Sequence, residues 1–217
     1  MAKGFAANGA VVYLVGRREE KLQEAKQAIE QVQAEGAEVY LSVPLRHRRS
    51  GAHSSIPADA SDREAVNALV SKLTRLDVLI NNAGVVYPDP PSTHLSPLPE
   101  LQASLLASPP DTWTKSFQVN VEAPFYLAAS VLHLLAQAPE AGRIINISSI
   151  GSVMADPSTH QPAYQASKAA VNHLTRLLAS KFRETGVRVN AVCERADLHR
   201  LSDLQIDQQL LDISPPR

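Results

Sequence analysis

The stretch Val-Leu-Ile-Asn-Asn-Ala-Gly, residues 78–84, is the strongest indication of the fold of this chain. Residues 78–80 form a short apolar run, which predicts a buried strand. Asn82, Ala83 and Gly84 follow directly, and small or turn-forming residues of this kind end a strand and let the backbone pass close to another group. The simpler interpretation of these three residues is an ordinary strand-to-loop turn. The sequence thus predicts a strand end that a ligand can approach.

Apolar runs and helical periodicities alternate on both sides of this stretch. Continuous β-branched runs indicate buried strands, whereas apolar residues three or four positions apart indicate helices. Because strands that alternate with helices form a parallel sheet covered on both faces, we expect an α/β protein. The expected elements are strand 11–15, helix 22–32, a helix capped by Ser61 and Glu64, helix 113–137, strand 143–147, helix 163–185 ended by Gly186, and strand 187–192.

Two segments interrupt this alternation. Residues 44–55 have no periodicity, and we expect an inserted loop that divides one strand in two. Their four consecutive basic or histidine residues, 46–49, favour a solvated loop over a nucleic-acid patch, because no aromatic residues are interleaved with them. Residues 88–110 hold seven of the fifteen prolines, so we expect a loop without a helix or central strand, lying over the substrate side.

Length and composition favour one soluble domain. A chain of 217 residues that is 44% hydrophobic can bury one sizeable core, so residues 1–217 are expected to form a single domain. The net charge of -1 gives no field to attract nucleic acid or an anionic membrane. The apolar runs are too short for a secretory signal or a membrane span, and we expect a cytoplasmic protein.

Cysteine and histidine usage argues against a metal site. Cys193 is the single cysteine, so no disulfide within the chain is possible. The seven histidines show no ligand spacing, and one cysteine cannot complete a set of ligands. We therefore expect no metal.

The run Tyr164-Gln-Ala-Ser-Lys168 carries the strongest chemical signal. A tyrosine four residues before a lysine on a helix lies beside it, and the ammonium is expected to lower the pKa of the phenol. Alone, this spacing is common on amphipathic helices. With Asn82 to Gly84, Asn120 in an apolar helix, and the pair Ser148-Ser149 at a strand end, it resembles the short-chain dehydrogenase/reductase family.

This resemblance implies a catalytic role for four residues. Tyr164 would exchange a proton with a carbonyl or alcohol oxygen while hydride moves to or from a nicotinamide. Lys168 would lower the pKa of Tyr164 and hold the nicotinamide ribose. Ser149, rather than Ser148, would bond the substrate oxygen. Asn120 would anchor a proton-relay water against Lys168, and the simpler interpretation, a core asparagine that caps a bent turn, is compatible with that role.

The same resemblance implies a dinucleotide cofactor. Arg17 and Arg18 follow the strand 11–15, where an acidic residue would bind the ribose of NAD. Because arginine opposes the dipole at a helix N-terminus, a phosphate explains the pair better, and we expect NADP or NADPH. Asp59 would bond the adenine, or simply lie in a turn before a helix. The expected cofactor-binding residues are Arg17, Arg18, Asp59, Asn82, Ala83, Gly84, Tyr164 and Lys168.

The resemblance fails at both ends of the chain. Residues 2–10 resemble the second half of the family's first helix, so the glycine-rich turn and the strand before it would precede Met1. That strand is central in the family's Rossmann-like, doubly wound sheet. Residues 194–217 form a divergent tail in place of the segment that covers the nicotinamide and of the last strand. We expect an incomplete Rossmann-like domain whose sheet is split.

Three functions follow from these observations. The first is an NADP-dependent oxidoreductase for a carbonyl or secondary alcohol, resembling 3-oxoacyl carrier protein reductases, with a possible homo-oligomer through the family's helix packing. The second is a catalytically inactive fragment or a non-enzymatic partner of a full-length homologue. The third is an NADP-sensing regulator, which would more naturally have lost Tyr164.

Overall fold

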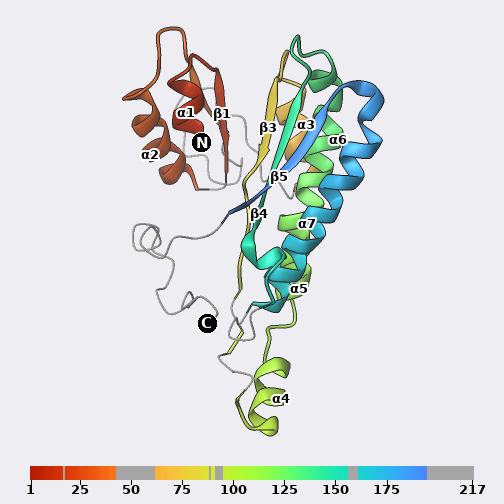
Figure 1. Ribbon diagram of the computed structural model, residues 1–217. Helices are drawn as coiled ribbons and strands as arrows, with labels where there is room; N and C mark the ends of the chain where they lie inside the picture. The colour runs from red at the N-terminus through yellow and green to blue at the C-terminus, as the bar shows by residue number, and fades with distance from the viewer. Residues whose placement is uncertain (17, 43–61, 88, 91–94, 156–160, 195–217) are drawn as a thin grey trace.

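The five strands form two separate parallel sheets. The computed structural model describes residues 1–16, 18–42, 62–87, 89–90, 95–155 and 161–194 (Figure 1). One sheet pairs β1 with β2, and the other has the order β3-β4-β5. All neighbouring strands run parallel. The strands are β1 Val12–Val15, β2 Val39–Ser42, β3 Val78–Asn81, β4 Arg143–Ser149 and β5 Arg188–Glu194.

Helices alternate with these strands, as the sequence periodicity predicts. Helices α1 and α2 contact β1 and β2, whereas α6 and α7 contact the strands of the second sheet, and α3 packs on α6. Figure 1 shows these two groups of helices on opposite sides of the strands. The helices are α1 Ala2–Ala6, α2 Glu19–Glu30, α3 Arg63–Val70, α4 Leu98–Leu106, α5 Thr112–Phe117, α6 Ala123–Ala136 and α7 Pro162–Lys181, with short turns η2 Gln118–Glu122, η3 Ile150–Ser152 and η4 Arg183–Thr185.

The break in the sheet lies where the sequence predicts it. No ladder joins β1 to β3 in the part of the chain that the structure describes. Val11, Tyr13 and Val15 remain 51%, 38% and 39% exposed, although such residues are normally buried in a central strand. The α/β class with a parallel sheet is confirmed, and its strands are divided into the two groups expected.

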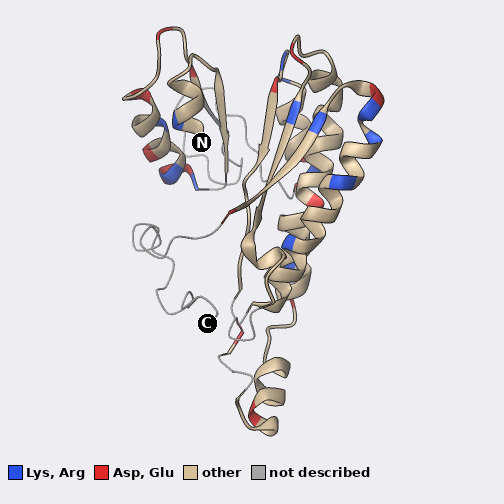
Figure 2. Cartoon of the chain, viewed as in Figure 1, with Lys and Arg blue, Asp and Glu red and all other residues tan. Residues whose placement is uncertain are grey.

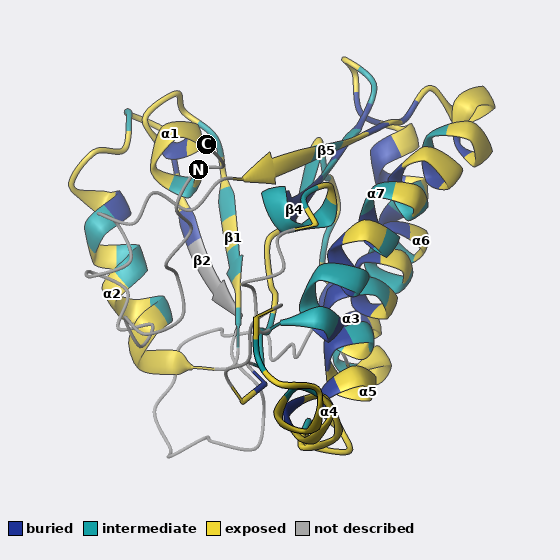
Figure 3. Cartoon of the chain, turned by 60° about the horizontal axis from the view of Figure 1, so that its bottom comes forward, coloured by how far each residue is buried: buried dark blue, intermediate teal, exposed yellow. Residues whose placement is uncertain are grey.

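Each sheet has its own apolar core. The larger core joins β4, α6 and α7, with Leu135 and Ile144 fully buried at its centre. The smaller core is formed by Ala6, Ile29 and Val39. Figure 3 shows that the buried residues of α3, α6 and α7 line the sides on which these helices meet the sheet and one another. Burial of apolar surface therefore orients α7, the helix that carries Tyr164 and Lys168.

Two expectations about local structure are wrong. The proline-rich segment contains a helix, α4, because Pro97 is its N-cap and Pro99 lies in its first turn, where a missing N–H costs no helical bond. Helix α3 is capped by Asp62, which accepts from the N–H groups of Glu64 and Ala65. An aspartate is as good a cap as a serine, and the expected Ser61 lies outside the described residues. Helix α4 extends beyond the carboxyl ends of the strands (Figure 1).

One helix in the described part of the chain is long enough to span a membrane. Residues Thr112–Ala136 run through α5, η2 and α6, and they are long and apolar enough to cross a membrane by length and composition alone. The expectation that no segment reaches this length is therefore wrong. The helix buries Ala128, Val131, Leu134 and Leu135 in the larger core, as the core helix of a globular domain does.

Lys and Arg positions and Asp and Glu positions are interspersed along the described ribbon (Figure 2). On α2 they form pairs one turn apart, such as Lys21 with Glu24 and Lys26 with Glu30. These pairs are exposed, so they contribute little to stability.

The close approach of α6 to β4 generates a prediction at Gly142. The Gly142 N–H donates to Leu135 O at 3.1 Å, and a Cβ at this position would lie 2.5 Å from that oxygen. Because both contacts involve the end of α6, Gly142→Ala is expected to lower the free energy of unfolding by about 1–3 kcal/mol in urea titrations. Gly4→Ala, a helical glycine with no atom within 4 Å of the added carbon, is the control and should stabilise by about 0.4–1 kcal/mol. Equal effects at the two positions would contradict this account.

Candidate active site

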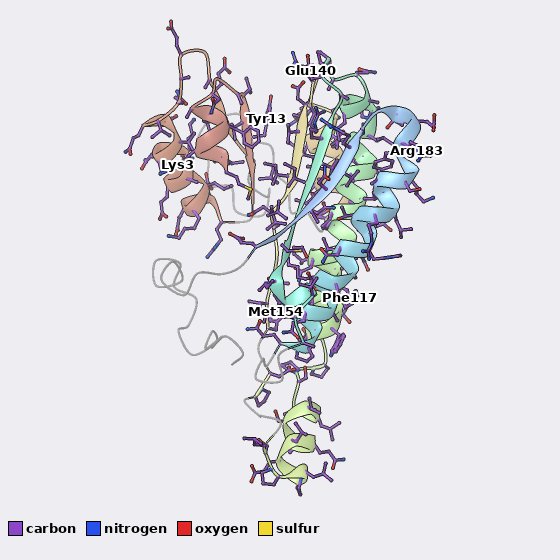
Figure 4. All side chains as sticks on the ribbon, in the orientation of Figure 1. Lys3, Tyr13, Phe117, Glu140, Met154 and Arg183 are labelled. Atoms are coloured by element: carbon purple, nitrogen blue, oxygen red, sulfur yellow. The ribbon has the colours of Figure 1, made fainter. Side chains whose placement is uncertain are left out.

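Polar side chains converge where β3 and β4 end and α7 begins. In an open parallel sheet, ligands bind outside the carboxyl ends of the strands. β3 ends at Asn81 and β4 ends at Ser149, while Tyr164 lies in the first turn of α7. Phe117 of α5 and Met154, just after η3, lie at the same end of the molecule (Figure 4). Residues far apart in the sequence thus meet at one edge.

A buried chain of hydrogen bonds ties this edge together. Asn81 Nδ2 donates to Asn146 Oδ1 at 2.8 Å, and Asn146 Nδ2 donates to Thr175 Oγ1 at 2.9 Å. The chain continues from Thr175 Oγ1 to Val171 O at 2.8 Å. It crosses from β3 through β4 to α7 in the interior, where unpaired polar groups are costly. The sequence analysis missed Asn146 and Thr175, although an asparagine inside the apolar run Arg-Ile-Ile-Asn-Ile is a usable signal.

Lys168 is the buried cation of the site. It is 5% exposed, and its Nζ donates to Ile147 O at 2.7 Å. Burial lowers the pKa of Lys168, and the negative charge of Glu194 opposes this shift. The carbonyl of Lys168 in turn accepts from Ser148 Oγ at 3.2 Å. Ser148 therefore faces α7, and its hydroxyl is used in holding the helix.

Tyr164 does not have the acidity that the sequence predicts. Burial raises its pKa, a hydrogen bond with Ser149 lowers it, and Glu194 raises it further, so that the pKa lies above the usual value for tyrosine. Lys168 Nζ lies 5.7 Å from the centroid of the tyrosine ring and donates to a backbone carbonyl. The expectation of a lowered pKa is wrong in this structure, because loss of hydration outweighs the favourable contact.

Ser149 lies beside Tyr164, on the opposite sheet face from Ser148. Its Oγ accepts from Gly151 N at 3.2 Å as the N-cap of η3, and its side chain lowers the pKa of Tyr164. Its carbonyl accepts from Ser152 Oγ at 2.6 Å. The turn after β4 thus brings Ser149 near the phenol, despite the long spacing between the two residues in the sequence.

Asn120 lies at the centre of the π-helical turn η2, a rare geometry that often occurs at functional sites. Its Oδ1 accepts from Val85 N at 2.8 Å, and its Nδ2 donates to Val85 O at 3.0 Å and to Ser167 Oγ at 2.9 Å. Ser167 Oγ then donates to Tyr164 O at 2.7 Å. The amide therefore joins the segment after β3 to the turn of α7 that carries Tyr164. Ser167, fully buried, is a second residue that sequence reasoning missed.

Gly84 lies close to two of these side chains. A Cβ on Gly84 would lie 3.4 Å from both Asn120 Oδ1 and Lys168 Nζ. Asn82, Ala83 and Gly84 are all exposed just after β3. The main chain here is open to a ligand next to the lysine ammonium, which suits the nicotinamide and ribose end of a dinucleotide.

The other expected cofactor residues are only partly described. Arg18 is the exposed N-cap of α2 just after β1, and its side chain makes no capping bond, while Glu19 and Glu20 occupy the first turn of the helix. Arg17 and Asp59 lie outside the described residues. Within the described ranges, no group of three or more histidine, cysteine, aspartate or glutamate side chains is arranged to hold a metal ion.

Comparison with known proteins gives one consistent result. A family model described as short chain dehydrogenase matches residues 1–195. The short-chain dehydrogenase/reductase PhomF' of Diaporthe leptostromiformis is 32% identical over 204 residues, which cover 88% of this chain and 62% of that protein. This chain therefore spans less than two thirds of the length of that relative.

Solved structures show the same fold. A metagenomic short-chain oxidoreductase in complex with NADP is 28% identical, with a TM-score of 0.67, over 88% of this chain and 74% of that structure. NAD+-bound xylitol dehydrogenase is 24% identical, with a TM-score of 0.68, over 89% of this chain and 64% of that structure. The similarity to xylitol dehydrogenase supports the fold alone.

The bridge made by Asn120 generates a stability prediction. Asn120→Ala leaves the Val85 N–H and C=O without their side-chain partners, at a cost of roughly 1–3 kcal/mol for each group left unpaired in the interior. The expected result is a clear fall in the urea midpoint with an unchanged m-value. Glu122→Ala, at an exposed position of the same turn, is the matched control and should change the midpoint little. If Asn120→Ala lowers the urea midpoint no more than Glu122→Ala does, the Asn120 bridge is unimportant for stability.

Proposed function

The chain belongs to the short-chain dehydrogenase/reductase family, and from this premise we propose that it transfers hydride between NADP and a carbonyl or secondary alcohol. The observation that carries the proposal is that the Ser149 side chain is close enough to Tyr164 to lower its pKa, beside the buried ammonium of Lys168. Two hydroxyl groups at one point suit a substrate oxygen, and a fixed positive charge nearby suits an oxyanion or a ribose hydroxyl.

In this proposal each side chain has one task. Tyr164 Oη gives its proton to the oxygen of a carbonyl, or takes the proton from an alcohol, and Ser149 Oγ orients that oxygen. The bound nicotinamide would supply or accept the hydride. A raised pKa keeps the Tyr164 phenol protonated near neutral pH, which is the form that donates. Asn120, through Ser167, positions the turn of α7 that carries Tyr164.

The choice of NADP rests on Arg17 and Arg18. An arginine after the second strand of the family's sheet pairs with a phosphate on the ribose, whereas NAD needs an acidic residue there. Arg18 is exposed and free of a capping role, which leaves its guanidinium available. The solved relative that holds NADP is compatible with this choice, while the structure with NAD+ shows that the fold accepts either cofactor.

The proposed setting is a cytoplasmic enzyme that acts on a small molecule as a homo-oligomer. Trp113 of α5, Phe125 of α6 and Leu177 of α7 are 46%, 38% and 47% exposed, and exposed large apolar residues on packed helices favour association. The surface of mixed charge gives no reason to propose nucleic acid as a partner.

A second function is favoured by one observation, the break between the two sheets. Without a ladder between β1 and β3, the carboxyl ends of these strands are not fixed relative to each other by backbone bonds. A chain of this kind could keep its catalytic side chains yet hold no cofactor, and act as the partner of a full-length homologue.

The two functions are distinguished by measuring NADPH turnover and binding by residues 1–217, with and without an added central strand. The first function predicts NADPH turnover by residues 1–217, whereas the second predicts negligible turnover. Adding a strand and glycine-rich turn from a related reductase before Met1 should produce NADPH binding, measured by nicotinamide fluorescence, because backbone N–H groups then meet the phosphates. In that longer polypeptide, Tyr164→Phe should abolish turnover and leave cofactor binding and the circular dichroism spectrum unchanged. Strong turnover by residues 1–217, free of host reductases, would exclude the second function, and a fully active phenylalanine variant would remove Tyr164 as the acid.

Cofactor preference is tested at Arg18. Replacing it by aspartate removes a charge-assisted pair that contributes roughly 1.5–3 kcal/mol and brings a carboxylate toward the phosphate. Arg18→Asp in the strand-supplied polypeptide should therefore weaken NADPH binding by about tenfold or more relative to NADH. Lys21→Asp, at an exposed position on the same helix, is the control for general charge. Equal affinities of the unmutated protein for the two cofactors would count against the proposal.

A further inference from the structure

The helical face that carries Tyr164 and Lys168 has a third polar residue. Asn172 follows Lys168 by four positions, as Lys168 follows Tyr164, and residues spaced in this way lie one above the other on one face of a helix. The Asn172 side chain is partly buried, and its Nδ2 donates to Ser152 Oγ at 2.6 Å. The amide therefore reaches from α7 to the turn η3, which follows the last residue of β4.

Ser152 connects this contact to Ser149. Its Oγ donates to Ser149 O at 2.6 Å, so one hydroxyl accepts from α7 and donates to the end of β4. Hydrogen bonds that are joined in a chain strengthen one another. Because Ser149 Oγ accepts from Gly151 N, both the carbonyl and the hydroxyl of Ser149 are held by the turn. This acceptor role leaves the hydroxyl proton of Ser149 for a partner outside the turn.

Cys193 of β5 contacts both members of the pair Asn172 and Ser152. Its Sγ lies 3.7 Å from Ser152 Oγ and 3.7 Å from Asn172 Nδ2. The ladder pairs Cys193 with Ser148, and paired residues project from the same face of the sheet. Since Ser148 Oγ donates to the main chain of α7, this is the face that α7 covers. Side chains whose positions agree with the strand register thus fix η3 to α7 and to β5.

Two asparagines act on different members of the site. Asn120 reaches the main chain of Tyr164 through one serine hydroxyl. Asn172 reaches the main chain of Ser149 through another. The separation of the phenol and the serine hydroxyl therefore depends on both amides.

From these contacts we propose that Asn172 is a positioning residue of the active site, which holds Ser149 in place through the hydroxyl of Ser152. The inference rests on the proposed function, since the position of Ser149 matters where Ser149 and Tyr164 act on one substrate oxygen. It adds two residues that the Tyr164 to Lys168 motif and the serine pair at the end of β4 do not contain.

The test uses the ionisation of Tyr164 as a measure of where Ser149 lies, and it requires no turnover. Residues 1–217 are labelled with ¹³C at the tyrosine ring carbon that bears the hydroxyl and titrated by NMR, with the signal assigned from Tyr164→Phe. The Ser149 side chain lowers the pKa of Tyr164, so Ser149→Ala gives the rise in pKa that complete loss of Ser149 causes. Ser152→Ala, which removes the connecting hydroxyl, is expected to raise the pKa of Tyr164 by no more than Ser149→Ala does.

Further variants test the path from Asn172 to Ser149. Asn172→Ala leaves the bond from Ser152 to Ser149 intact and should raise the pKa of Tyr164 by less than Ser152→Ala does. Ser152→Thr keeps the hydroxyl and should keep the pKa of the unmutated chain. Adding Ser152→Ala to Ser149→Ala should cause no further rise, because no hydroxyl remains to be positioned. His173→Ala, at the exposed neighbouring position of α7, is the control and should leave the pKa unchanged.

The sign of the shift distinguishes positioning from a loosened structure. If Ser152→Ala and Asn172→Ala only admitted water, the pKa of Tyr164 would fall, because burial raises it. A fall, or no change, overturns the proposal, whatever happens to the urea midpoint. If Ser152→Ala does not fold, the milder Asn172→Ala decides by the same criterion. A failure of the proposed oxidoreductase function would appear as absent turnover in the strand-supplied polypeptide and would leave these titrations unaffected.

Discussion

Two hydrogen bonds between α7 and β4 fix the position of everything else in the site. Lys168 Nζ donates to Ile147 O, and Ser148 Oγ donates back to Lys168 O, so that one helical residue is held at both its side chain and its main chain. Tyr164 lies one turn before this point, and Ser149 is the next residue of the strand. Because the joint is buried, water does not compete for its bonds. The geometry of the proton-transferring pair follows from it.

The π-helical turn makes the second essential connection. A π turn accommodates an additional residue in a helix, and here it directs the Asn120 amide toward the main chain of Val85 rather than along the helix. The same amide reaches Ser167 on α7. A polar side chain in an apolar helix therefore joins three segments, and no backbone hydrogen bond joins the described residues of these segments to one another here.

Much of the fold and part of the site could be predicted from the sequence, for identifiable reasons. Apolar runs and helical periodicity are local, so the strand 78–80 and the helix that carries Tyr164 were predicted with only small errors at their ends. The pKa of Tyr164 could not be predicted, because it depends on how much water the folded chain removes. Helix α4 was missed because the effect of a proline depends on its position in the helix. The place of Cys193 beside α7 follows from strand register, which no local pattern encodes.

The separation of the two apolar cores has a consequence for the cooperativity of unfolding. The core of Ala6, Ile29 and Val39 shares no residue with the core around Leu135 and Ile144, and no described backbone ladder links the two sheets. Loss of one core therefore uncovers little of the other. We expect the chain to behave as two foldons, of which the smaller, which carries Arg18, opens at a lower free energy. In that case amide protons of β1 and β2 exchange with solvent while those of β4 remain protected.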